Sequence, residues 1–226
     1  MTFILPKEPQ EKDIKPFVII CEGMSDATFV DRCLKHLAIT NCWIGCPSDK
    51  TGGGQGVDKI PAYLSGIQTI TRGRNILSGI AVVADADRSL QRKFKTIKKG
   101  FTAAQFPSPR LPYSFVAAHP RVGIYFIPRK GKSGTLEHLL LEAAFKKKPS
   151  LRHCVDAFSA CVRTRTKRWS ANEQVKMKLS ALVSVTCRKN PWASSNTMWG
   201  DKGCPVPINS ACFQEFRKFL RDFTQP

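Results

Sequence analysis

The apolar residues of the chain up to about residue 145 alternate between short continuous runs and helical spacings. Runs at 17–21 and 79–84 are rich in β-branched residues, as expected of strands that are buried on both faces of a parallel sheet. A third run, 122–128, ends at a proline and is also predicted to be a strand. Between these runs apolar residues recur every three or four positions, which is typical of amphipathic helices. Strands that alternate with helices predict an α/β fold with a mostly parallel sheet.

Weaker signals fill the gaps between these strands. Residues 42–46 form a shorter apolar stretch that we interpret as a further strand, and the proline-punctuated stretch 106–120 is expected to be loop. Ser25 is expected to cap the helix that follows the first strand. In the helix predicted over 88–99, the apolar residues share one side, and we place the basic residues, Lys93 among them, around the remainder.

Beyond residue 149 the pattern becomes mainly helical. The spacing predicts helices at 151–163, 172–187 and 210–223. We therefore expect a Rossmann-like sheet flanked by helices, followed by a helical C-terminal extension. The predicted organisation is an N-terminal segment at 1–15, an α/β domain at 16–148 and the extension at 149–226.

The charge balance suggests a polyanionic partner. The 226 residues include 36 Lys and Arg against 17 Asp and Glu, which gives a formal charge of +19. Such a surplus attracts nucleic acid, DNA or RNA, although a surface tuned for solubility, an acidic protein or an anionic membrane face would also fit. No apolar run approaches the length that crosses a bilayer, and the apolar segment at the N-terminus is too short for a signal peptide. We therefore expect a cytoplasmic location and no association with a membrane.

Acidic residues are scarce, and three of them follow predicted strands. Glu22 comes directly after the first strand, and Asp85 and Asp87 follow the strand at 79–84. Ligands of open α/β sheets bind at the carboxyl ends of the strands, where these side chains are expected to lie. Carboxylate oxygens suit Mg²⁺ or Mn²⁺ better than Zn²⁺. An Asp-x-Asp taken alone would equally fit a turn or a helix cap.

The same residues carry a family resemblance. The string Ile20-Cys-Glu22-Gly-Met-Ser-Asp26, followed by Ala-Val-Val-Ala-Asp85-Ala-Asp87, resembles the Toprim domain shared by topoisomerases, DnaG-type primases and OLD-family nucleases. Ile127-Pro128 and the later Gly134-Thr-Leu136-Glu137 are similar to small stand-alone Toprim-related proteins. The resemblance covers roughly residues 16 to 145. It implies a catalytic α/β domain in that part of the chain.

By this resemblance Glu22, Asp85 and Asp87 are the metal-site acids, and Glu137 is a further ligand. Glu137 would also fit as an acidic residue favoured at a helix N-terminus, and Glu142 is a reserve candidate. Two divalent ions held by such acids would activate water and stabilise the departing oxygen of a phosphodiester. The resemblance therefore implies a metal-dependent nuclease.

Basic side chains complete the expected site. The helix around Lys176 and Lys178 resembles the lysine-containing helix that follows the Toprim domain in related nucleases, and either lysine could neutralise charge in the transition state. Arg88 would hold a phosphate or pair with one of the acids. The triplet Gly131-Lys-Ser133 is not a P-loop, because Phe126 stands where the first glycine is required.

Two hypotheses of different classes result. The first is a Toprim-class phosphodiester hydrolase, for which the resemblance also implies an ATPase partner and a role in antiviral defence against phage. The second is a non-catalytic basic subunit that binds nucleic acid within a larger complex. The oligomeric state stays open, with a homodimer as one arrangement.

Overall fold

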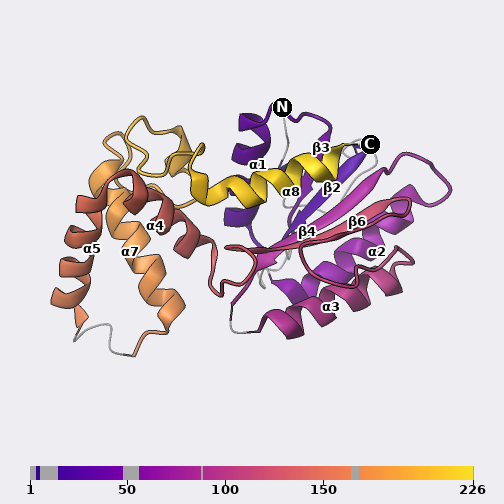
Figure 1. Cartoon of the computed structure of the whole chain (residues 1–226), viewed down its shortest axis with the longest axis horizontal. Coiled ribbons are helices and arrows are strands. Elements are labelled where there is room, and N and C mark those ends of the chain that lie inside the picture. The colour runs from indigo at the N-terminus through magenta and orange to yellow at the C-terminus, as the bar shows by residue number, and fades with distance from the viewer. Residues whose placement is uncertain (1–3, 6–14, 48–55, 88, 164–167, 226) are drawn as a thin grey trace. The chain divides into compact units, whose positions relative to one another are not determined.

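A computed structural model describes most of the chain, namely residues 4–5, 15–47, 56–87, 89–163 and 168–225. The chain forms two compact units (Figure 1). The first comprises Met1–Ser133 together with Glu215–Pro226, and the second comprises Gly134–Gln214.

The first unit contains a six-stranded sheet with the order β1-β3-β2-β4-β6-β5. The strands are β1 (Ile4–Leu5), β2 (Phe17–Cys21), β3 (Cys42–Gly45), β4 (Gly79–Asp85), β5 (Phe115–Val116) and β6 (Arg121–Ile127). All neighbours pair in parallel except β5, which runs antiparallel to β6. The predicted α/β class with a mostly parallel sheet is confirmed.

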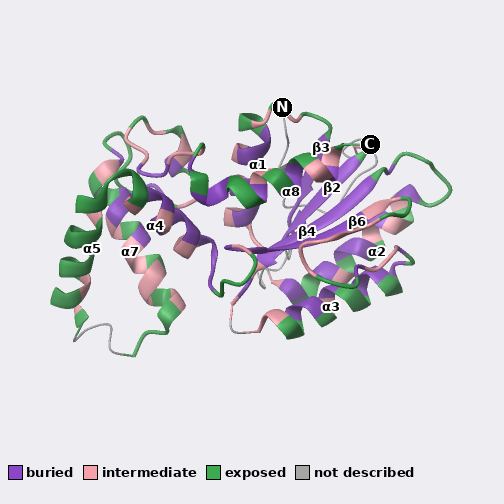
Figure 2. Ribbon diagram, viewed as in Figure 1, coloured by how far each residue is buried: buried purple, intermediate pink, exposed green. Residues whose placement is uncertain are grey.

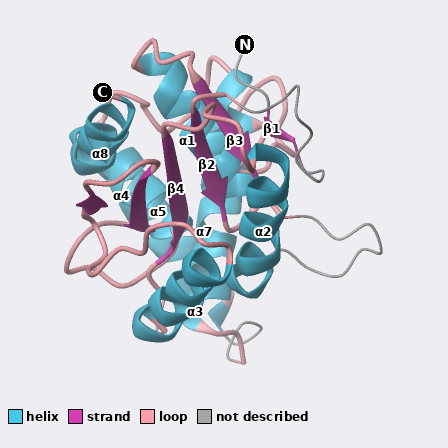
Figure 3. Ribbon diagram, turned by 90° about the vertical axis from the view of Figure 1, so that its right-hand side faces the viewer, coloured by secondary structure: helices cyan, strands magenta, loops and turns pink. Residues whose placement is uncertain are grey.

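Helices cover both faces of this sheet (Figure 3). They are α1 (Met24–His36), α2 (Ile60–Thr71), α3 (Leu90–Ala103) and α8 (Gln214–Thr224), with the short 3₁₀ turn η2 (Val57–Lys59) before α2. Helices α2 and α3 lie side by side on one face, and α1 and α8 lie on the other. The sheet is thus buried between two helical layers, which explains the continuous apolar strands.

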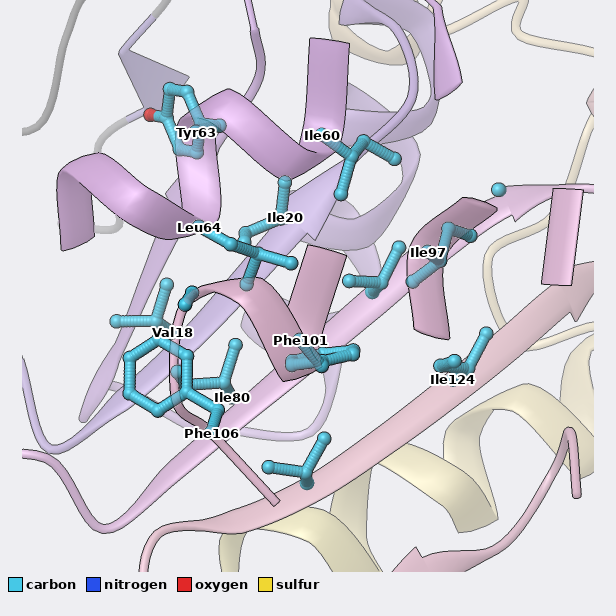
Figure 4. Packing of buried hydrophobic residues seen from close by; sticks show 14 of the residues in the cluster. Val18, Ile20, Ile60, Tyr63, Leu64, Ile80, Ile97, Phe101, Phe106 and Ile124 are labelled. Carbon is cyan, nitrogen blue, oxygen red and sulfur yellow. The ribbon is translucent and has the colours of Figure 1, made fainter. Parts of the chain in front are cut away.

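The core under α2 and α3 is built from alternate strand residues (Figure 4). Ile20 of β2 and Ile80 of β4 lie beneath Leu64 of α2 and Phe101 of α3, and all four are fully buried. Helices α2 and α3 approach closely at Gly100, where an added Cβ would lie 2.9 Å from the Cα of Pro61. A side chain at that position would push the two helices apart.

The opposite face is aromatic. Phe216 of α8 stacks on Phe29 of α1 with ring centroids 5.3 Å apart, and Phe223 meets Phe17 of β2 edge-on at 5.3 Å. Tyr125 of β6 packs against Phe216 at 4.9 Å. The last helix therefore belongs to the first unit, although it was expected within the C-terminal extension.

The second unit is helical, with α4 (Leu136–Lys147), α5 (Pro149–Cys161), α7 (Ala171–Thr186) and the 3₁₀ turns η3 (Met198–Gly200) and η4 (Ala211–Phe213). Half of the residues of α4 are buried, whereas α7 buries only Leu179, Leu182 and Val183. Much of α5 is exposed (Figure 2). Among the described residues, no helix combines the length and the apolar character needed to span a membrane.

Three local expectations were wrong. Helix α1 begins at Met24, so its N-cap residue is Gly23 and not Ser25. The backbone N–H of Gly23 donates to Asp26 Oδ2 at 3.0 Å. The stretch expected to be loop contains β5. Lys93, placed on the polar side of its helix, is only 4% exposed.

Candidate functional site

The sheet topology brings the ends of β2 and β4 together. From β2 the chain passes through α1 to β3 on one side, and then through α2 to β4 on the other side of β2. The strand order therefore reverses between β2 and β4, and open α/β sheets bind ligands at such a switch point. Glu22 directly follows β2, Asp85 ends β4, and Asp87 lies two residues further on.

Hydrogen bonds fix Glu22 against the end of β4. The backbone N–H of Glu22 donates to the carbonyl of Val83 at 3.0 Å. The backbone N–H of Asp85 in turn donates to Glu22 Oε2 at 3.1 Å. The Glu22 carboxylate therefore reaches across to the neighbouring strand and lies beside the Asp-x-Asp segment.

Lys93 of α3 joins the two acidic segments. Its Nζ lies 2.9 Å from Glu22 Oε1, 2.8 Å from Glu22 Oε2 and 2.9 Å from Asp87 Oδ2. The lysine side chain is 5% exposed, whereas the side chains of Glu22 and Asp87 are 19% and 27% exposed. Carboxylates from two strand ends thus converge on one cationic nitrogen, which uses its three N–H donors on them.

The start of α3 explains this placement. The buried side of α3 consists of Phe94, Ile97, Gly100 and Phe101, and Lys93 continues that side at its N-terminal end. Asp87 Oδ1 accepts the backbone N–H of Ser89 at 2.9 Å and the Ser89 hydroxyl at 2.7 Å, which anchors the turn before the helix. The spacing of Lys93 four residues before Ile97 was the available signal that this lysine points inward.

The charges of this cluster stabilise one another. Burial alone would lower the pKa of Lys93, but hydrogen bonds and charge from Glu22 and Asp87 raise it above the ordinary value. Burial opposes the ionised form of Asp87 as well, yet hydrogen bonds from Ser89 and Lys93 hold its pKa below the ordinary value. At neutral pH the Asp87 carboxylate and the Lys93 ammonium are therefore both charged.

The donor set suits a hard divalent cation, because carboxylate oxygens from Glu22 and Asp87 already surround one positive charge. Within the described ranges, however, no three or more His, Cys, Asp or Glu side chains form a group able to hold a metal ion. The Lys93 ammonium lies between the two carboxylates. A metal held by Glu22 and Asp87 would thus require Lys93 to move.

A pocket of about 420 Å³ opens beside Asp87. Its lining also includes Tyr113 and the exposed turn at 130–133, with Lys130 and Lys132. The buried hydroxyl of Tyr113 has no hydrogen-bond partner in the part of the chain that the structure describes. The Gly131-Lys-Ser133 segment, rejected above as a P-loop, therefore forms a basic rim around a pocket that reaches Asp87.

The other predicted site residues lie in the second unit. Glu137 is in the first turn of α4 and accepts the hydroxyl of Thr135 at 2.7 Å, as a residue at a helix N-terminus can. Lys178 forms an ion pair with Asp156 at 2.8 Å, and Lys176 is exposed on α7. The assignment of these residues to the site stays a prediction.

Two candidates remain, Glu142 and Arg88. Glu142, the reserve ligand, lies in α4 near Cys212, whose Sγ is 3.9 Å from Glu142 Oε1. Arg88, expected to hold a phosphate or to pair with an acid, is outside the described residues.

Comparison with known proteins places the chain in a family. The model of the family described as "Protein of unknown function (DUF3226)" matches residues 16–225. The chain belongs to the DUF3226 family. No curated protein matches this DUF3226 chain. Among solved structures it is similar to the C-terminal region of the Burkholderia pseudomallei OLD protein, with a TM-score of 0.45 and 14% identity over 92% of this chain and 98% of that one.

Proposed function

We propose that this DUF3226 protein is a divalent-metal-dependent nuclease that hydrolyses phosphodiester bonds of DNA or RNA. The observation that carries the proposal is the convergence of Glu22 and Asp87, from the ends of neighbouring strands, on a single positive charge at the switch point of the sheet. The Toprim resemblance of the same residues and the formal charge of +19 also support it.

In this proposal Glu22 and Asp87 hold Mg²⁺ or Mn²⁺. Asp85, at the end of β4, and Glu137 are further ligands. The metal, when bound, neutralises charge on the phosphodiester and makes water a stronger nucleophile. Lys130 and Lys132 on the rim of the neighbouring pocket attract the phosphates of the strand. Lys176 or Lys178 assists the departing charge.

Cleavage of end-labelled single-stranded and duplex DNA and RNA tests the proposal, with Mg²⁺, Mn²⁺ or EDTA present. Asp87→Asn should lower the rate by at least about 100-fold, because the loss of a carboxylate weakens the hold on the metal and its orientation. Asp58→Asn is the matched control, since Asp58 is exposed on η2 and its substitution removes the same charge. Equal activity of the wild type and the two variants would contradict the proposed site.

A second candidate is a non-catalytic subunit that binds nucleic acid. Lys93 favours it, because an ammonium that already neutralises two carboxylates can serve the fold alone. In that case the protein would bind labelled DNA or RNA in the assay above and cleave neither with any metal. An ATPase partner and a defence role follow from the Toprim resemblance alone, and copurification of an ATPase with the tagged protein would test them.

A further inference from the structure

The Lys93 ammonium occupies a position that a metal ion would need. Its three contacts are all to carboxylate oxygens of Glu22 and Asp87, at 2.8 to 2.9 Å. A divalent ion takes such oxygens at about 2.0 to 2.6 Å, and it would repel an ammonium that remained against them. The same oxygens therefore cannot serve both cations in this geometry.

We infer that Lys93 is an internal counter-cation that competes with the divalent metal for Glu22 and Asp87. This inference rests on the proposed function, whose metal site it deepens. Without metal, Lys93 holds the two carboxylate groups in place through its three contacts. When metal binds, the ammonium must leave, so the metal affinity of the wild type is lowered by the cost of breaking three charged contacts.

The partial exposure of the carboxylates fits an exchange of cations. Glu22 and Asp87 keep 19% and 27% of their side-chain surface exposed, and Asp87 also lines the neighbouring pocket. A metal ion can therefore approach the carboxylates from solvent while Lys93 is still in place. A lysine suits this role because its flexible four-carbon stem lets the ammonium move without a change in the helix.

Binding of Mn²⁺ to the full chain, read from the electron paramagnetic resonance signal of the free ion, tests the inference. Lys93→Met should bind Mn²⁺ at least about 10-fold more tightly than the wild type, since one charged contact contributes at least a factor of ten. Lys95→Met is the control, because Lys95 is exposed on the same helix and loses the same charge. Equal or weaker binding by Lys93→Met would overturn the inference.

A measurement on the wild type covers the case in which Lys93→Met does not fold. Lys93 should resist reductive methylation without metal, because its side chain is 5% exposed, and should react once Mn²⁺ saturates the protein. Unchanged protection at saturation would overturn the inference. Tighter Mn²⁺ binding by Lys93→Met without any cleavage by the wild type would refute only the nuclease proposal.

An independent observation concerns the second unit, where a pocket of about 430 Å³ is strongly basic. Among the described residues that line it, four are basic and none is acidic. The basic residues are Lys147, Lys148, Arg188 and Lys202. Lys147 is the last residue of α4, and Lys148 lies between α4 and α5. Arg188 follows the end of α7, and Lys202 lies in the loop at 202–205. Like charges gathered around one hollow repel one another, and an anion would relieve that repulsion.

The loop at 202–205 that lines this pocket is held in place. The backbone N–H groups of Gly203 and Lys189 donate to the carboxylate of Asp201 at 2.6 and 3.0 Å. Gly203 packs so closely on α7 that an added Cβ would lie 2.0 Å from the carbonyl oxygen of Thr186. The position of Lys202 relative to α7 is thus fixed by the backbone.

We propose that this basic pocket binds the phosphates of a nucleic-acid strand. Fluorescence anisotropy of a labelled single-stranded oligonucleotide over a salt series tests it. Lys148→Glu/Lys202→Glu should weaken binding at least 10-fold and make the negative slope of log K against log salt shallower by about 1.4, as expected for two lost phosphate contacts. The control is Lys95→Glu/Lys98→Glu, which reverses two exposed charges on α3.

Equal weakening by the pocket and control variants would overturn the proposal, because binding would then depend on total charge. Unchanged binding by the pocket variant would do the same. An acidic peptide that displaces the oligonucleotide from the wild type, and binds more tightly than it, would assign the pocket to an acidic protein and also contradict the proposal.

Discussion

Replacing Lys93 with methionine should destabilise the first unit by about 3 kcal/mol in metal-free buffer. Methionine keeps the length of the buried stem but removes the charge that contacts Glu22 and Asp87. Loss of one partner from a buried ion pair costs about 3 to 5 kcal/mol. We expect the lower end, because water reaches carboxylates that are 19% and 27% exposed.

Thermal unfolding in EDTA measures this effect, and a loss of about 3 kcal/mol corresponds to a decrease of about 6 to 12 °C in Tm for a chain of this size. Lys95→Met should stay within about 0.5 kcal/mol of the wild type. The triple variant Glu22→Gln/Asp87→Asn/Lys93→Met should recover much of the loss, because the cost arises from unpaired charges. A Lys93→Met protein as stable as the wild type, or a triple variant no more stable than the single one, would show that Lys93 does not stabilise the fold by neutralising Glu22 and Asp87.

Three further outcomes are expected. The folded state lowers the pKa of Asp87, so ionised Asp87 stabilises the protein above the ordinary carboxyl pKa, and this stabilisation is lost as the pH falls through the lowered value. Between about pH 6 and pH 2 the Tm of Asp87→Asn should therefore depend less on pH than the Tm of the wild type. An unchanged pH profile of Tm would contradict this. Gly100→Ala should cost about 1 to 2 kcal/mol in urea unfolding, as contact with Pro61 outweighs the better helix propensity, and a stabilised variant would contradict the packing. Ser170→Ala should cost about 1 kcal/mol, since its hydroxyl accepts the backbone N–H of Glu173; an unaltered Tm would mean that this cap contributes nothing.

Much of the first unit could be predicted from the sequence. The strands at β2 and β4 were visible because strands covered by helices on both faces are apolar at every position. Strand β5 was missed because two residues carry no periodicity. The position of α8 was also missed, since its aromatic side packs on α1 and β2, far away in the sequence.

The candidate site was only partly predictable. Glu22 and Asp87 could be placed together because the ends of parallel strands share one edge of the sheet. Lys93 was assigned to the polar side from its charge, although its helical position matches the buried residue Ile97. Charge is a poor guide to burial where two carboxylates compensate for lost hydration, and single-sequence patterns do not show such partners.

The metal site at Glu22 and Asp87 is tested most directly by the anomalous scattering of Mn²⁺ in crystals soaked with that ion. We expect a peak in contact with carboxylate oxygens of both Glu22 and Asp87, with Lys93 Nζ moved away from them. A saturating soak that leaves Lys93 bound to both carboxylates and no peak beside them would contradict the claim that these strand ends form a metal site.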